Sequence, residues 1–208
     1  MSLYERYAVL STAKYDIEKA KDTVIASFKA GGKLLLCGNG GSAADCEHIV
    51  GELMKGFLSG RHLSDEQKQA MIKNANYINR DWLDKLQGGL PAIALTSATA
   101  LNSAFCNDVD PELVYAQQLM GLAKKEDVVF CISTSGNSKN VCAAATVGKA
   151  LGVKVIALTG KGGGRLKEIA DVCICAPETE TYKVQELHLP IYHYICAEAE
   201  KYFFSNCD

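Results

Sequence analysis

Two short segments of the sequence consist almost entirely of glycine, asparagine, serine and threonine. They read GNGGS (38–42) and STSGNS (133–138), and each leads into a stretch with helical spacing. A turn of this composition at a helix N-terminus presents backbone N–H groups and the positive end of the helix dipole, which suit a phosphate group. One such turn alone usually only allows a tight corner. Two of them on different strands, meeting at one edge of a sheet, predict an anion site.

Neither segment matches a nucleotide-binding motif. GNGGSA lacks the GxGxxG spacing of dinucleotide-binding folds, and neither turn is a GxxxxGK(S/T) P-loop. A third turn, TGKGGG (159–164), is also rich in glycine. The residues predicted to bind the anion are Asn39, Gly40, Gly41, Ser42, Ser133, Thr134, Ser135 and Ser138.

A histidine and a glutamate follow the first turn at helical spacing. His48 and Glu52 are four residues apart, so a helix places both on one face. This spacing suits two ligands of one metal ion, or an acid–base pair that faces a pocket. A His/Glu pair at this spacing is more often only a surface contact. The phosphate turn one to two helical turns upstream favours a functional role.

The C-terminal part of the chain contains a second group of polar residues, within TYKVQELHLPIYH (181–193). Gln185 and His193 are about 12 Å apart along an ideal helix. They could share one ion only if the helix broke between them, and Pro190 offers a break because it lacks an N–H group. His188 and His193 have apolar neighbours, which equally fit a structural role.

The spacing of apolar residues predicts a layered α/β fold. Continuous apolar runs, typical of strands buried on both faces of a parallel sheet, occur at 33–38, 91–97, 127–134, 153–160 and 171–177. Helical spacing occurs between them and at the chain ends, at about 3–30, 43–56, 111–124, 138–151, 164–170 and 183–205. This alternation predicts a doubly wound, five-stranded parallel sheet with right-handed crossovers.

One segment, 57–90, does not fit this alternation. Its helical spacing begins after Ser64, a favourable N-cap residue, and stops at Gly88 and Gly89. We expect one or two extra helices, inserted between the first helix of the layer and the second strand. The 208 residues are otherwise expected to form a single domain.

Composition narrows the range of functions. The formal net charge is −2 and no block of basic residues is present, which argues against nucleic acid or an anionic membrane as the main partner. No apolar stretch is long enough to span a bilayer, and the N-terminus lacks the apolar core of a signal peptide. The chain is therefore expected to be cytoplasmic. Its nine cysteines, Cys207 among them, include no paired CxxC modules, which predicts free thiols in a reducing compartment.

Several segments together resemble the sugar isomerase (SIS) domain family. They are LLLCGNGGSAADCEHIVGEL, ALNSAFCNDVD, VVFCISTSGNSKNV, GVKVIALTGKGGGRL and TYKVQELHLPIYH, in that order. CGNGGSA and STSGNS are typical of the superfamily. Their combination with two further motifs, H…GEL and VQE…H, is most similar to the phosphoheptose isomerases. The resemblance covers residues 1–56 and 90–205.

The resemblance implies a flavodoxin-like sheet and a homotetramer with active sites at subunit interfaces. It implies an aldose–ketose isomerase that converts D-sedoheptulose 7-phosphate to D-glycero-D-manno-heptose 7-phosphate through an enediol. By motif, Glu52 would be the base that moves a proton between C1 and C2, and His193 its acid–base partner. Such chemistry needs a carboxylate base and a proton donor. The resemblance also implies zinc held by His48, Glu52, Gln185 and His193, with Gln185 and Asp108 near the sugar.

The sequence departs from the family pattern at positions that bear on the substrate. Lys55 is the nearest basic residue where an arginine usually follows EL, and Lys183 replaces an arginine, which loses the bidentate fork. Two other functions remain: an enzyme acting on a pentose, hexose or amino-sugar phosphate, and a non-catalytic sugar-phosphate sensor or regulatory partner. The presence of both Glu52 and His193 favours an enzyme, since a sensor needs no acid and base at one sugar.

Overall fold

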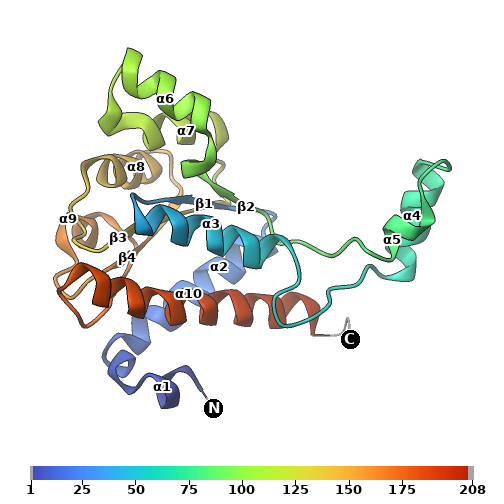
Figure 1. The fold of residues 1–208 in the computed structure, drawn as a ribbon, viewed down its shortest axis with the longest axis horizontal. Coiled ribbons are helices and arrows are strands. Elements are labelled where there is room, and N and C mark those ends of the chain that lie inside the picture. Colours follow the sequence, from blue (N-terminus) through green and yellow to red (C-terminus); the bar gives the residue numbers. More distant parts are fainter. Residues whose placement is uncertain (1, 206–208) are drawn as a thin grey trace.

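A computed structural model of the chain describes residues 2–205 (Figure 1). Its centre is a five-stranded, fully parallel sheet with strand order β2-β1-β3-β4-β5. Each strand lies within one of the apolar runs, which confirms the predicted sheet. Every residue of the central strands β1 and β3 is buried, as expected when helices cover both faces. The strands are β1 (Leu34–Cys37), β2 (Ala92–Ala94), β3 (Val128–Ser133), β4 (Lys154–Thr159) and β5 (Val172–Cys175).

Helices cover both faces of the sheet (Figure 1). Successive side chains of a strand point to opposite faces, so Leu34 joins one core and Leu35 the other. The first core packs against α2 (Lys14–Lys29), α3 (Gly41–Met54) and α10 (Thr181–Phe204). The second packs against α7 (Val114–Leu122), α8 (Lys139–Ala150) and α9 (Gly164–Ile169).

Two helical predictions need correction. The single helix expected over 3–30 is divided into α1 (Leu3–Arg6), a 3-10 helix (Ala8–Ala13) and α2. Tyr7, at φ −126° and ψ 71°, leaves helical geometry and ends α1. The sequence pattern also fails to predict α6 (Thr99–Asp108), because none of its residues is buried and it therefore carries no apolar stripe facing the core.

The segment between α3 and β2 forms the predicted insert. It contains two helices, α4 (Asp65–Asn74) and α5 (Arg80–Leu83). Ser64 caps α4 as expected, and Gln67 returns a bond to the Ser64 backbone. Helix α4 buries no residue, and both helices project away from the body of the molecule (Figure 1).

Helix α10 runs without a break from Thr181 to Phe204, with Pro190 inside it. The break considered between Gln185 and His193 is therefore absent. These two side chains stay about 12 Å apart along the helix axis, too far to bind one ion from the same chain.

Two general expectations concern the whole chain. Within residues 2–205, no helix has both the length and the hydropathy needed to cross a membrane. The eight cysteines that the structure describes are free thiols, and five of them are buried. Cys207 lies outside the described residues.

Candidate active site

A cavity of about 310 Å³ lies where three helices begin, beyond the ends of β1 and β3. We call it the cradle. Helices α3, α8 and α10 all start at or next to its wall. Seven of the eight residues predicted to bind an anion line it; Ser135 does not. The lining residues are Asn39, Gly40, Gly41, Ser42, Ile132, Ser133, Thr134, Ser138, Thr181 and Gln185.

The helix starts at the cradle are not capped by side chains. Gly40 precedes α3 at φ 55° and ψ −121°, a conformation that favours glycine, and it has no side chain to offer. Ser138 precedes α8, but its hydroxyl makes no capping bond and instead lies 3.0 Å from the Ser133 hydroxyl. The uncapped N-termini of α3 and α8, together with the Ser133 and Ser138 side chains, therefore line the cradle, which suits an anion.

Contacts between segments fix the shape of the cradle. The side-chain amides of Asn39 and Asn140 form two reciprocal hydrogen bonds, of 2.8 and 2.9 Å, which connect the first turn to α8. Gln185 lies so close to the start of α3 that a Cβ at Gly41 would be 2.3 Å from Gln185 Nε2. A side chain at position 41 would therefore displace the Gln185 amide from the cradle wall.

Three ligand-type side chains converge further along the same two helices. His48 and Glu52 share one face of α3, with His48 Nε2 3.1 Å from Glu52 Oε1. His193, on α10, brings its Nε2 within 3.3 Å of His48 Nε2. The ligand atoms of all three lie within 4.8 Å of one another. We call these residues the His/Glu/His group.

The surroundings of the group set its charge. Burial, and next the neighbouring His48, lower the pKa of His193, so this imidazole is neutral near pH 7. The Glu52 side chain is 14% exposed, and Lys55 Nζ lies 3.6 Å from its Oε2 atom. A carboxylate beside a neutral imidazole is able to take up one proton while the imidazole donates another.

Two residues that the sequence did not single out support the group. The Tyr192 hydroxyl lies 3.0 Å from His48 Nδ1 and donates to Asp45 Oδ1 at 3.1 Å. Burial raises the pKa of Asp45, whose Oδ2 atom has no hydrogen-bond partner among the described residues. Tyr192 therefore fixes the ring orientation of His48, as outer residues do at metal and catalytic sites. The only signals in the sequence were that Asp45 lies three residues before His48 and that Tyr192 directly precedes His193.

Two of the three ligand distances in the group match those around a small divalent metal ion. A tetrahedral ion with bonds of about 2.0–2.1 Å places neighbouring ligand atoms about 3.4 Å apart. The distances of 3.1 Å to Glu52 and 3.3 Å to His193, both measured from His48 Nε2, are close to that value. The ligand atoms of Glu52 and His193 lie within 4.8 Å of each other, so a small movement of one of these side chains would bring all three onto one ion. Two imidazoles and one carboxylate also form a donor set of catalytic sites that keep one position open.

Comparison with known proteins assigns almost the whole chain to one family. Two family models, both described as SIS domain, match residues 5–88 and 88–194. This chain belongs to the SIS domain family. Among SIS relatives, the phosphoheptose isomerase of Akkermansia muciniphila is 33% identical over 206 residues, which cover 99% of this chain and 95% of that protein. The phosphoheptose isomerase of Roseiflexus sp. is 38% identical over 185 residues, which cover 89% and 81%.

A solved SIS structure agrees with this assignment. The phosphoheptose isomerase of Neisseria gonorrhoeae matches with a TM-score of 0.70 and 30% identity, over 96% of this chain and 100% of that one. The five-stranded parallel sheet described above is therefore the sheet of the SIS fold.

Two residues predicted for the SIS-type site lie outside both the cradle and the His/Glu/His group. Ser135 is exposed, and its hydroxyl accepts the Asn137 N–H at 3.2 Å. Asp108 is exposed at the end of α6 and accepts a bond of 2.8 Å from Asn107. Gln185 lines the cradle and is not part of the His/Glu/His group.

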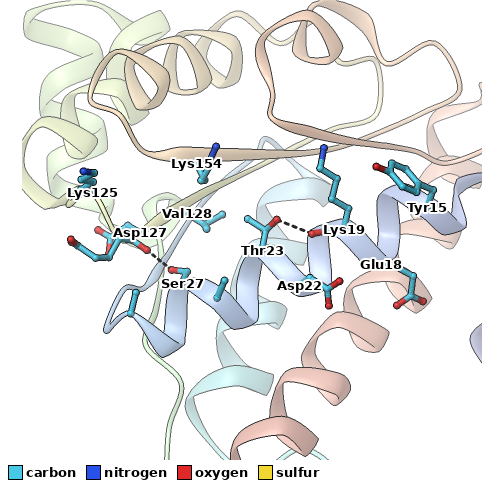
Figure 2. A pocket seen from close by; sticks show the side chains of 13 residues that line it. Tyr15, Glu18, Lys19, Asp22, Thr23, Ser27, Lys125, Asp127, Val128 and Lys154 are labelled. Carbon is cyan, nitrogen blue, oxygen red and sulfur yellow. Dashed lines mark hydrogen bonds between the residues drawn. The ribbon is translucent and has the colours of Figure 1, made fainter.

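A larger cavity, of about 650 Å³, lies at the opposite ends of the strands. Residues of α2 line it, together with Val128 and Lys154, the first residues of β3 and β4 (Figure 2). Ligands of parallel α/β sheets bind beyond the carboxyl ends of the strands. Charged residues at this cavity are also paired, Asp127 with Lys33 and Lys154 with Asp171. The cradle, and not this cavity, is therefore the candidate site.

Proposed function

We propose that this chain is a phosphoheptose isomerase, which interconverts D-sedoheptulose 7-phosphate and D-glycero-D-manno-heptose 7-phosphate through an enediol. One observation carries the proposal: a cradle suited to phosphate and the His/Glu/His group lie on the same pair of helices, α3 and α10. The relatives compared above bear the name of this activity. A phosphosugar held at its phosphate in the cradle can thus meet a His/Glu/His group, of the same or a neighbouring chain, at its other end.

The separation of the two sites favours a long sugar. Along α3, Glu52 is ten residues beyond Ser42, or about 15 Å, and along α10 His193 is about 12 Å beyond Gln185. In a heptose 7-phosphate the reacting carbons, C1 and C2, lie at the far end of the chain from the phosphate. A seven-carbon substrate therefore covers more of this distance than shorter phosphosugars do.

Each residue has a defined role in the proposed reaction. The Glu52 carboxylate removes a proton from C1 of the ketose and returns it to C2 of the enediol, which yields the aldose. His193, a neutral imidazole, moves a proton from the C1 oxygen to the C2 oxygen, as neutral histidine does in other aldose–ketose isomerases. The proposed substrate-binding residues are Asn39, Gly40, Gly41, Ser42, Ser133, Thr134, Ser138 and Gln185, with Ser135 and Asp108 added by family resemblance.

The same group is proposed to hold zinc, which when bound would polarise the substrate carbonyl as a Lewis acid. His48, Glu52 and His193 would supply the ligands from one chain. Gln185 is proposed as a ligand only from a neighbouring chain, because within its own chain it lines the cradle.

We propose that residues 1–208 form a single SIS domain, that the protein is a homotetramer and that it is cytoplasmic. The homotetramer, with sites at subunit interfaces, follows from the family resemblance. The cytoplasmic location is supported by the eight free thiols among the described residues, which suit a reducing compartment.

Turnover of a panel of phosphosugars tests the proposed function. Purified protein is incubated with sedoheptulose 7-phosphate and with pentose, hexose and amino-sugar phosphates, and products are followed by NMR. We expect aldose formation from sedoheptulose 7-phosphate with kcat/KM at least roughly tenfold above any other sugar, or about 1.4 kcal/mol of discrimination. Faster turnover of another sugar would assign a different phosphosugar isomerase. Binding without turnover of any sugar would assign a sensor.

A further inference from the structure

Arg61 is fully buried although it belongs to the largely exposed insert. Its side chain has no accessible surface. Its backbone has φ 47°, a left-handed conformation that is unfavourable for a residue with a side chain. Such a residue persists only where the surrounding groups fix it, so its contacts indicate its purpose.

The guanidinium group of Arg61 binds the C-terminal end of α3. Nη1 donates to the carbonyl oxygen of Leu53 at 2.6 Å, and Nη2 donates to the carbonyl oxygen of Glu52 at 2.9 Å. The last carbonyl groups of a helix lack partners within the helix and carry the negative end of its dipole, so a cation is favoured there. Arg61 therefore fixes the helix at the residue that bears the proposed base.

The same guanidinium group binds α10. Its Nε donates to Glu200 Oε1 at 2.6 Å, and it stacks 4.8 Å from the centre of the Phe204 ring. Glu200 is buried, and its two oxygens also accept the backbone N–H groups of Phe57 and Leu58 at 2.8 and 2.7 Å. Burial acts to raise the pKa of Glu200, but these bonds and Arg61 together hold it below the usual value. Arg61 and Glu200 therefore form a charged pair that joins both helices.

We propose that Arg61 is a positioning residue, which locks α3 against α10 so that Glu52 and His193 keep the spacing that their chemistry and metal binding require. This inference rests on the function proposed above. Glu200 lies seven residues beyond His193, or two turns of α10, so the lock sits next to the His/Glu/His group. The cradle lies at the other end of the two helices.

The outer part of the insert takes no part in this lock. We call residues 63–86 the arm. His62 and Gln87 pair in an antiparallel bridge, and the Gly88 N–H donates to the Arg61 carbonyl at 2.8 Å, so the arm begins and ends at one point. A two-residue turn can therefore replace the arm and leave Arg61 in place. The insert is thereby divided into a base that serves the site and an arm that does not.

Three variants test the inference: Arg61→Lys, the double variant Arg61→Met/Glu200→Leu, and the arm replaced by Asn-Gly. Measurements are kcat and KM for sedoheptulose 7-phosphate, affinity for Zn²⁺ by competition with a chelator, and Tm. Lysine keeps the charge but lacks the two-pronged fork, so we expect kcat and Zn²⁺ affinity each to fall about tenfold or more. KM should stay within about twofold, because the cradle is remote from the lock.

The other two variants separate positioning from stability. The double variant avoids leaving one buried charge unpaired, but it also removes the acceptors of the Phe57 and Leu58 N–H groups, so we expect a lower Tm. Measured well below that Tm, where the protein is fully folded, kcat and Zn²⁺ affinity should show the same losses as in Arg61→Lys. The arm replacement should keep kcat, KM and Zn²⁺ affinity within about twofold, since it leaves every contact of Arg61 intact.

Two results would overturn the inference. One is a double variant with wild-type kcat and wild-type Zn²⁺ affinity, which would make the lock dispensable. The other is a loss of kcat in Arg61→Lys matched by a rise in KM and a fall in Tm, which would indicate general loss of structure. If the wild-type protein isomerises no sugar, the proposed function fails; the Zn²⁺ affinities then decide, a tenfold loss supporting the lock and an unchanged affinity refuting it.

Discussion

The cradle and the His/Glu/His group lie on the same two helices, yet they are built differently. The cradle combines helix starts, glycine backbone and hydroxyl groups from several segments. The His/Glu/His group consists of three side chains, of which His48 is held by Tyr192 and Glu52 belongs to a helix end fixed by Arg61. If one hydrogen-bond donor of the cradle is lost, others can still bind the anion, whereas no other residue can replace a member of the group. Single substitutions should therefore weaken the cradle slightly and disable the group.

The largest effect is expected for Glu52→Gln. Glutamine keeps the size of the side chain but cannot accept the C1 proton, so kcat should fall by at least about 10³-fold, with little change in substrate affinity. Steady-state kinetics and calorimetry measure both. Glu47→Gln, on the same helix but bonded to Ser97, is the matched control and should stay within about twofold. Equal losses in both variants would contradict the assignment of the base.

The cradle and the group both depend on α10, whose stability should depend on pH through His188. This residue lies between Gln185 and His193 and donates to the Thr159 carbonyl at the end of β4. Burial lowers its pKa to about 4, below the value of about 6.5 in the unfolded chain. The unfolded state then binds more protons between pH 6.5 and 4, so stability is full above pH 6.5 and falls as the pH drops through this window. We expect a loss of about 2 kcal/mol between pH 7 and pH 5.

Denaturant unfolding at several pH values measures this effect, with His188→Gln as the control. Glutamine can keep the bond to Thr159 but does not titrate. The lowered pKa values of Glu18 and Asp171 act mainly below pH 5 and are common to both proteins. Parallel curves for the two proteins between pH 7 and pH 5 would show that His188 is not the cause.

A smaller effect is expected for Tyr192→Phe, which removes the hydroxyl contact to His48 Nδ1 and the bond to Asp45. Outer contacts of this kind typically change metal affinity or activity by about 10–100-fold, and we expect roughly tenfold in kcat and Zn²⁺ affinity. Tyr194→Phe, which loses a bond to Glu18 instead, should leave both values within about twofold. Equal losses in Tyr194→Phe and Tyr192→Phe would mean that the Tyr192 hydroxyl has no specific role in holding His48.

The smallest effect is expected for Ser42→Ala in the cradle. One hydroxyl among several donors is lost, so KM should rise about three- to tenfold, in line with about 1 kcal/mol per hydrogen bond, while kcat stays within about twofold. Ser103→Ala, exposed on α6, should change neither value. A fall in kcat without a rise in KM for Ser42→Ala would mean that this hydroxyl takes part in the catalytic step. The cradle would then not serve for binding alone.

The features that could be predicted from the sequence are local ones. The five strands follow from continuous apolar runs, and the cradle follows from two turns that must end neighbouring parallel strands at the same edge. The facing of His48 and Glu52 follows from their spacing on one helix. The role of His193 beside Glu52 came only from the family resemblance, because spacing paired it with Gln185 and its apolar neighbours equally suit a structural role.

The features that could not be predicted depend on how distant elements pack. Tyr192 reaches His48 and Asp45 only because of the rotation of α10 against α3, which no spacing within either helix determines. Arg61 looks like a surface residue in a polar segment, yet it is buried by Glu200 from the other end of the chain. Helix α6 carries no buried stripe, so its pattern contained no signal.

Proton exchange in heavy water tests the division between cradle and group most directly. Sedoheptulose 7-phosphate is incubated with the wild type, Glu52→Gln and His193→Ala, deuterium at C1 is followed by NMR, and binding is measured in parallel by calorimetry. The account predicts exchange and aldose formation with the wild type only, and a Kd within about threefold in all three proteins, since they share the cradle. A wild type that binds the sugar without exchanging it, or a Glu52→Gln variant that exchanges at the wild-type rate, would contradict the account.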